Sequence, residues 1–196
     1  MVNQSMNNQI HKAIEILRKG GIVIFPTDTA FGIGCRIDDN DSIKRLFAIR
    51  QRPLTKATPV LACSQVMVEE YASDIPEAVR IHLMDRYWPG ALTIILKARK
   101  DKVHKLVRGE SEGVGMRIPN HPIPLQMIEE LGVPIIGTSA NFHGEQTPYS
   151  SDALSPQLKT QVDYVVDGEC TLKKESTVID STYEPWKILR QGAIKL

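Results

Sequence analysis

The chain has few cysteines and no spacing that would hold a structural metal. Its 196 residues include only Cys35, Cys63 and Cys170, and no two of them form a Cys-x-x-Cys pair. Three scattered cysteines cannot build a disulfide framework and do not match the usual zinc sites. The five histidines are dispersed, and none is paired with an acidic residue at metal-ligand spacing. We therefore expect no metal site made by the protein alone, and a reduced, cytoplasmic compartment.

Long apolar runs and the common nucleotide-binding motifs are also missing. No apolar run approaches the about 18 residues of a membrane span, and Val2-Asn3-Gln4-Ser5 give no signal-like apolar core. The sequence contains no Gly-x-x-x-x-Gly-Lys, Gly-x-Gly-x-x-Gly or Gly-x-Ser-x-Gly. These absences argue against a membrane protein, a P-loop enzyme, a Rossmann dinucleotide site and a nucleophile-elbow hydrolase.

The charge is almost balanced. With 24 basic and 23 acidic residues the net charge is +1, which argues against a protein that binds nucleic acid with its whole surface. Basic residues gather over 97–102 and 104–108, and we interpret both stretches as solvated surface.

The length and hydrophobic content fit a single globular domain. Hydrophobic residues make up 42% of the chain, which is ordinary for a globular protein. We therefore expect one domain over residues 1–196.

Helix and strand patterns alternate along the first two thirds of the chain. Ile10, Ala13, Ile14 and Leu17 predict an amphipathic helix closed by Gly20-Gly21. Further helices are expected after a cap at Asp41 or Ser42, after Ser64, from Pro76 to Trp88, and over 123–131. Strands are expected over 22–25, 58–63, 91–96, 113–118 and 133–137, and near Tyr164, Val178 and Ile188. This order predicts an α/β fold with a mixed sheet.

Small polar residues border three of the predicted strands. Thr138-Ser139-Ala140-Asn141 follow one apolar run, Pro26-Thr27-Asp28-Thr29 follow another, and Ser176-Thr177 precede a third. Open α/β sheets bind ligands at the carboxyl ends of strands. Arginines lie nearby in sequence at Arg50, Arg52, Arg117 and Arg190, and guanidinium groups bind phosphate or carboxylate. Taken singly, each segment is equally explained as a capped turn, a helix end or a surface ion-pair partner.

The order of the segments is more specific than any one of them. The chain resembles the YrdC-like family of threonylcarbamoyl-AMP synthases over nearly its whole length. The matching segments are residues 26–32, Arg50-Gln51-Arg52-Pro53, 87–93, Arg117-Ile118-Pro119, 138–141, 175–180 and 190–194. The resemblance implies a twisted, mostly mixed β-sheet flanked by helices, with a concave ligand-binding face.

The resemblance also implies an activity. L-Threonine, bicarbonate or CO2, and ATP with Mg²⁺ would give threonylcarbamoyl-AMP and pyrophosphate. Downstream threonylcarbamoyl transferase proteins would use the product to modify position 37 of tRNA. Nucleotidyl transfer of this kind depends on positioning and charge neutralisation more than on a covalent nucleophile. Arginines and hydroxyls without a nucleophile suit that chemistry.

Site roles follow from the resemblance, position by position. The threonine pocket would be formed by Thr29, Phe31, Arg117, Thr138 and Ser176, with Arg117 on the carboxylate. Arg50, Arg52, Ser139 and Asn141 would form the catalytic set at the nucleotide. Thr147 and Arg190 also align with nucleotide-contacting positions of the family.

Several residues depart from the family pattern. Arg50 replaces the usual Lys, Phe31 replaces the usual Tyr, and Cys63 falls near the position of a usual His. These changes favour, as an alternative, a YciO-like paralogue with weak or altered activity that acts mainly by binding tRNA or double-stranded RNA. Dependence on ATP and threonine would separate that reading from the synthase. A carbamoyltransferase module of the same fold ranks last, because such modules usually accompany additional cysteines.

Overall fold

The amphipathic pattern at the start of the chain forms the first helix. The structure, a computed structural model, describes residues 4–109 and 111–196. Helix α1 (Gln4–Arg18) buries Ile10, Ala13, Ile14 and Leu17, the four residues that predicted it. The chain then turns at Gly20, where a φ of 79° places the backbone in the left-handed region that favours glycine.

The strands form two mixed sheets, which confirms the predicted α/β class. The smaller sheet has the order β7-β2-β1-β8, in which β1 pairs antiparallel with β2 and parallel with β8. The larger sheet has the order β10-β9-β4-β5-β3-β6. The strands are β1 (Val23–Phe25), β2 (Gly32–Gly34), β3 (Val60–Leu61), β4 (Leu92–Lys97), β5 (Gly113–Arg117), β6 (Ile135–Ile136), β7 (Thr138–Ser139), β8 (Tyr164–Val165), β9 (Thr177–Asp180) and β10 (Lys187–Arg190).

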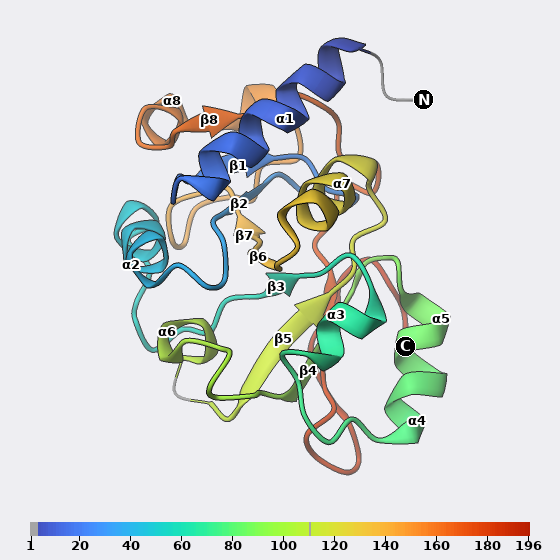
Figure 1. The fold of residues 1–196 in the computed structure, drawn as a ribbon. Helices are drawn as coiled ribbons and strands as arrows, with labels where there is room; N and C mark the ends of the chain where they lie inside the picture. Colours follow the sequence, from blue (N-terminus) through green and yellow to red (C-terminus); the bar gives the residue numbers. More distant parts are fainter. Residues whose placement is uncertain (1–3, 110) are drawn as a thin grey trace.

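Helices cover both sheets (Figure 1). Helices α1 and α7 (Pro122–Leu131) pack together against one face of the smaller sheet, and α2 (Asn40–Ile49) contributes to the apolar cluster on its other face. The remaining helices are α3 (Gln65–Glu69), α4 (Glu77–Val79), α5 (Asp85–Tyr87), α6 (Lys105–Arg108) and α8 (Pro156–Lys159), with a π-helical turn over Arg80–Met84 and a 3-10 turn over Ser151–Ala153.

Two local predictions need correction, and one strand was missed. The cap of α2 is Asp39, whose side chain accepts from the backbone N–H groups of Asp41 and Ser42, rather than Asp41 or Ser42 themselves. The strand expected over 58–63 is only β3, since Ser64 already caps α3. Strand β2 was not predicted. Its sequence, Gly32-Ile33-Gly34, has low strand propensity, but it pairs with β1 on one side and β7 on the other.

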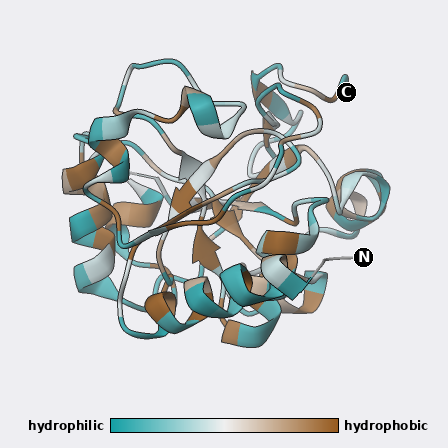
Figure 2. Ribbon diagram, turned by 90° about the horizontal axis from the view of Figure 1, so that it is seen from above, coloured by the Kyte–Doolittle hydropathy of each residue, from teal (hydrophilic) through white to brown (hydrophobic). Residues whose placement is uncertain are grey.

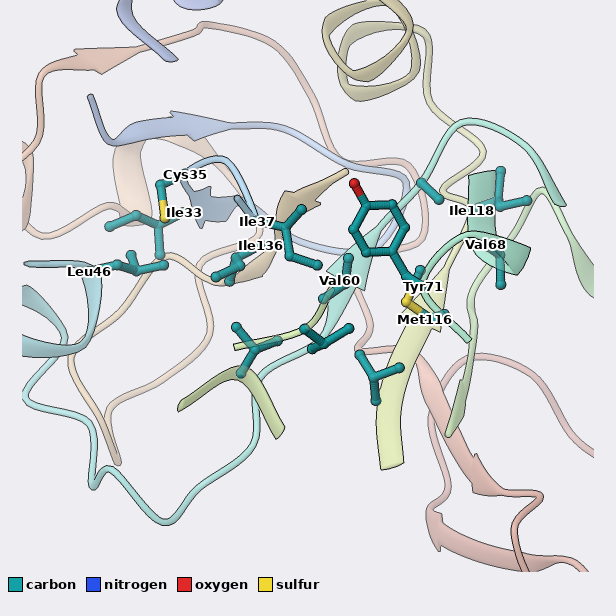
Figure 3. Close-up of a cluster of buried hydrophobic side chains, with 14 of the residues drawn as sticks. Ile33, Cys35, Ile37, Leu46, Val60, Val68, Tyr71, Met116, Ile118 and Ile136 are labelled. Carbon is teal, nitrogen blue, oxygen red and sulfur yellow. The ribbon is translucent and has the colours of Figure 1, made fainter. Parts of the chain in front are cut away.

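Apolar side chains fill the space between the sheets and their helices. Figure 2 shows apolar strands at the centre and polar outer faces on the helices. Val60, Ile136 and Met116, from three strands of the larger sheet, lie in one buried cluster with Tyr71 and Val68 (Figure 3). In β4 and β5 alternate residues point into this cluster, as the two-residue period of a strand requires. The opposite face of β4 and β5 is therefore left for other contacts.

The two sheets meet where β6 runs directly into β7. Ile135–Ile136 belong to the larger sheet and Thr138–Ser139 to the smaller one, so a single residue, Gly137, separates them. A Cβ atom on Gly137 would overlap the Leu61 side chain, and one on Gly34 would overlap the Ile136 carbonyl oxygen. Glycine is needed at both positions because backbone and side chain approach so closely at the junction.

Candidate functional site

A cavity of about 300 Å³ lies at the junction of the two sheets. Its floor is the uncovered face of the larger sheet, formed by Thr93 and Ile95 of β4, Gly115 and Arg117 of β5, and Val178 of β9. Its walls come from Thr27, 29–32, 57–59, Leu61, 137–139, Thr147 and 175–176. The cavity thus gathers segments that are far apart in the sequence. Over residues 4–109 and 111–196, its charged lining residues are three arginines and one carboxylate, Arg52, Arg117, Arg190 and Glu175.

Arg117 is held rigidly in the floor of this cavity by three hydrogen bonds. Its Nη2 donates to Asp28 Oδ1 at 2.5 Å, its Nη1 to Thr29 Oγ1 at 2.8 Å, and its Nε to the Gly90 carbonyl at 2.9 Å. The Arg117 and Asp28 side chains are only 7% and 3% exposed. Burial lowers the pKa of Arg117, and the neighbouring Asp28 opposes that shift. The pair therefore keeps a positive group on the cavity floor in a geometry that does not need to be reorganised.

Hydroxyl groups line the floor beside Arg117. Ser176 Oγ lies 2.9 Å from Thr93 Oγ1 and accepts from Arg190 Nη2 at 3.1 Å. Thr93 is the one polar residue in the otherwise apolar run 91–96, and it faces the cavity. Such a polar residue inside a buried strand is a signal that the sequence analysis did not use.

Glu175 links the loop after β7 to the carboxyl-terminal part of the chain. Its Oε1 accepts from Thr147 Oγ1 at 2.9 Å, and its Oε2 lies 3.3 Å from Arg190 Nη1. Arg190 also donates from Nε to the Ser176 carbonyl at 3.0 Å. The carboxylate therefore orients Thr147 and Arg190, two of the residues that the family resemblance placed near the nucleotide.

Arg52 also lines the cavity. Its Nε donates to the Lys56 carbonyl at 3.1 Å and its Nη2 donates to the Ala57 carbonyl, so the guanidinium is folded against the following loop. Burial lowers the pKa of Arg52. Next to this loop, Thr58 lines the cavity, and its buried Oγ1 has no hydrogen-bond partner in the part of the chain that the structure describes.

Arg50 and Asn141 lie behind the cavity wall rather than on it. Arg50 is 2% exposed and Asn141 is 7% exposed, and neither is among the lining residues. Arg50 Nη2 donates to Asn141 Oδ1 at 2.9 Å, and Asn141 Nδ2 donates to the Glu145 carbonyl. Burial and the nearby charge of Arg52 lower the pKa of Arg50 to about 10.

The structure brings together nine of the eleven site residues expected from the sequence. Those that line the cavity are Thr29, Phe31, Arg52, Arg117, Thr138, Ser139, Thr147, Ser176 and Arg190. Cys63, at the position near the family histidine, is not a lining residue, and its Sγ lies 3.9 Å from Met67 Sδ. Lining residues that the sequence analysis gave no role include Thr58, Thr93, Ser111 and Glu175.

Residues 4–109 and 111–196 contain neither a metal-binding cluster nor a membrane-spanning helix. Within these ranges no group of three or more His, Cys, Asp or Glu side chains is placed to hold a metal ion. Across the same ranges, none of the helices combines the length and apolar character needed to cross a membrane.

The chain matches a known protein family over most of its length. A family model that covers Sua5, YciO and YrdC proteins, described as "Telomere recombination", matches residues 15–192. The threonylcarbamoyl-AMP synthase of Bacillus subtilis is 34% identical over 187 residues, which is 95% of this chain. This chain spans only about half of that relative, 54% of its length.

Two solved structures share the fold closely. The crystal structure of Pyrococcus abyssi Sua5 in complex with L-threonine is 34% identical, with a TM-score of 0.88 over 93% of this chain and 54% of that one. The crystal structure of Escherichia coli YciO is 32% identical, with a TM-score of 0.81 over 94% of this chain and 89% of that one.

Proposed function

Because the chain belongs to the Sua5/YciO/YrdC family, we propose that it is a threonylcarbamoyl-AMP synthase. The observation that carries the proposal is the cavity, where three arginines converge with the hydroxyls of Thr29, Thr138 and Ser176 at the junction of the sheets. The resemblance to a Sua5 structure that contains L-threonine supports threonine as one substrate.

The proposed reaction proceeds in two steps. The neutral threonine amine first attacks CO2 and releases a proton, or attacks bicarbonate and releases water, and either route gives a carbamate. A carbamate oxygen then attacks the α-phosphorus of ATP, the bond to the β-phosphate oxygen breaks, and pyrophosphate leaves. Neither step needs a covalent enzyme intermediate, so the protein contributes alignment of the reactants and stabilisation of negative charge.

The threonine end of the cavity is assigned to the face around Arg117. Three N–H groups of Arg117 are already bonded to Asp28, Thr29 and Gly90, which leaves two of its five N–H groups for a substrate carboxylate. Ser176 and Thr138 would supply hydrogen bonds, and Phe31, which is fully buried, would limit the space for the side chain.

The nucleotide end is assigned to Arg52, Ser139, Thr147 and Arg190. Arg52 and Arg190 provide two cations for the phosphates, while Ser139 and Thr147 offer hydroxyl donors. Mg²⁺ would enter with the nucleotide as a complex with its phosphates, because Glu175 is the one carboxylate among the lining residues that the structure describes and already bonds Thr147. The ion would neutralise charge on the phosphates when bound.

Pyrophosphate release tests the proposal directly. Purified protein is incubated with ATP, Mg²⁺ and bicarbonate, with L-threonine, with L-serine or with neither. We expect release that depends on threonine and is much weaker with serine. Ser139→Ala, which removes one cavity hydroxyl and should leave the fold intact, is expected to lower the rate. Absence of threonine-dependent release from folded protein that binds ATP would contradict the proposal.

A second candidate is a YciO-like protein of weak or altered activity that binds RNA. One observation favours it: Arg50, which stands where the family usually has a lysine, is bonded to Thr138 and Asn141 and does not line the cavity. The basic stretches do not add support, because Lys97 pairs with Asp74 at 2.7 Å and Lys100 pairs with Glu112. Binding of tRNA without any dependence on ATP and threonine would favour this candidate. A tRNA-directed role of either kind would place the protein in the cytoplasm.

A further inference from the structure

Two residues of the expected catalytic set are bonded to each other and turned away from the cavity. Arg52 and Ser139 line the cavity, whereas Arg50 and Asn141 do not. Each residue of the hidden pair is less than a tenth exposed. The set is therefore divided into a front pair, Arg52 and Ser139, and a back pair, Arg50 and Asn141.

The back pair is bonded to the strand that carries the front hydroxyls. Arg50 Nη1 donates to Thr138 Oγ1 at 2.7 Å, and Nη2 lies 3.4 Å from Ser139 Oγ. Arg50 Nε donates to the Asn141 carbonyl at 3.0 Å, and Nη2 donates to Asn141 Oδ1 at 2.9 Å. All three nitrogens of the guanidinium are thus directed at residues 138–141.

The backbone of Arg50 strengthens the same connection. Its N–H caps α2 by donating to the Leu46 carbonyl at 3.1 Å, and its own carbonyl accepts from His143 N at 2.9 Å. The end of α2 is therefore joined to both sides of the turn that follows β7. A shift of this turn would move the Thr138 and Ser139 hydroxyls relative to Arg52 and Arg117 across the cavity.

We propose that Arg50 and Asn141 are positioning residues, which act on the substrates through Thr138 and Ser139. Arg50 makes no phosphate contact and fixes where the two hydroxyls point. This inference rests on the proposed function. It goes beyond that function because it assigns the contacts with the nucleotide phosphates to Arg52 and Arg190, and to neither Arg50 nor Arg117.

The contacts explain why arginine suits this position. A guanidinium spreads its donors over three nitrogens in a rigid plane, so it bonds the Thr138 hydroxyl and two oxygens of Asn141, the backbone carbonyl and Oδ1, at once. A lysine has a single nitrogen and cannot reach all three acceptors together. The position therefore requires a particular shape in addition to a positive charge.

Two neighbouring substitutions separate positioning from phosphate binding. Arg50→Gln and its matched control Arg52→Gln each remove one positive charge. We expect Arg50→Gln to bind a non-hydrolysable ATP analogue within about threefold of the wild type, while Arg52→Gln weakens binding about tenfold or more, as loss of a charge-assisted hydrogen bond predicts. A similar loss of ATP affinity in both variants would overturn the proposal.

Arg50→Lys is a second test, on which the two roles predict opposite results. Because this variant keeps the buried positive charge, it remains usable if Arg50→Gln does not fold. A positioning role predicts that kcat falls about tenfold with the KM for ATP nearly unchanged, whereas a phosphate-binding cation predicts that kcat is kept. Full kcat in Arg50→Lys would therefore contradict the proposal. Circular dichroism on each variant confirms folding, because a purely structural role would leave kcat per folded molecule unchanged.

The affinity comparison does not depend on turnover. If wild-type protein releases no pyrophosphate with threonine, the proposed function fails, but binding of the ATP analogue to Arg50→Gln and Arg52→Gln still shows which arginine contacts phosphate. The two failures are thus distinguishable in one set of experiments.

Discussion

Arg117 serves both the fold and the proposed substrate site. Its ion pair with Asp28 is buried on both sides, so removing one partner leaves a buried, uncompensated charge. We expect Arg117→Ala to lower the free energy of unfolding by about 3–5 kcal/mol. Threonine affinity should also fall, by about 1.5–3 kcal/mol, because the substrate carboxylate loses a charge-assisted bond. Urea unfolding and threonine binding by calorimetry measure the two effects.

A double variant separates these two roles of Arg117. Asp28→Asn combined with Arg117→Met removes both charges and retains most of the side-chain volume. Most of the lost stability should return, since neither buried charge is then unpaired. Threonine binding should stay weak. Recovery of threonine binding in the double variant would show that Arg117 does not contact the substrate.

Thr58 and Thr93 are buried cavity threonines that differ in hydrogen bonding. Thr93 Oγ1 lies 2.9 Å from Ser176 Oγ, whereas Thr58 Oγ1 has no partner among the described residues. Thr→Val preserves shape and removes only the hydroxyl. We expect Thr58→Val to leave the free energy of unfolding unchanged or raise it by about 1 kcal/mol, and Thr93→Val to lower it by about 1 kcal/mol. Thermal unfolding of the two variants measures this difference. A Thr58→Val variant less stable than Thr93→Val would contradict the assigned hydrogen bonding.

Helix α2 begins at a charged cap whose contribution depends on pH. Asp39 accepts from Asp41 N at 3.1 Å and from Ser42 N at 3.0 Å, and the Ser42 N–H is the main cause of its lowered pKa. A carboxylate is also favoured at the positive end of a helix. Asp39→Ala should therefore cost about 1 kcal/mol of stability near neutral pH.

Asp39→Asn tests the charge alone, because an amide still caps the helix. A carboxyl group whose pKa is lower when folded stabilises the protein above its unfolded pKa of about 4. That stabilisation is lost as the pH falls through the pKa of the carboxyl group in the folded protein. The wild type should thus exceed the Asn variant in stability at pH 7, and the two should converge in acid. An unchanged difference at low pH would contradict the electrostatic explanation.

The same helix shows what the sequence could and could not predict. Its apolar face was recognised, but Asp39, Asn40, Asp41 and Ser42 are all favourable caps, so only the extended backbone of Asp39 decides among them. The two-residue spacing of Arg50 and Arg52 likewise does not reveal which one faces the cavity. The end of α2 turns Arg50 inward, toward residues 138–141, and that contact depends on a strand about 90 residues away.

The segments bordering the cavity were more predictable. Polar residues next to apolar runs drew attention to Thr29, Thr138, Ser139 and Ser176, and all four line the same cavity in the structure. The division of the strands into two sheets was not predictable, since it depends on Gly137 carrying the chain from one sheet to the other.

The junction of the two sheets determines whether the cavity exists at all. Strand β2 passes so close to β6 that a Cβ on Gly34 would overlap the Ile136 carbonyl oxygen. The backbones of β2 and β6 cannot shift to relieve this overlap as easily as a flexible side chain could. We expect Gly34→Ala to lower the free energy of unfolding by about 3 kcal/mol and to weaken both threonine and ATP-analogue binding, because each ligand site draws walls from both sheets.

Gly132 is the matched control for this substitution. It ends α7 with a φ of 71°, but nothing lies within 4 Å of a Cβ built there. Gly132→Ala should therefore cost only about 1 kcal/mol through backbone strain and leave ligand binding unchanged. Urea unfolding combined with binding of both ligands distinguishes the two variants. Equal losses of stability, or full ligand binding by Gly34→Ala, would mean that the sheets can separate without disturbing the site.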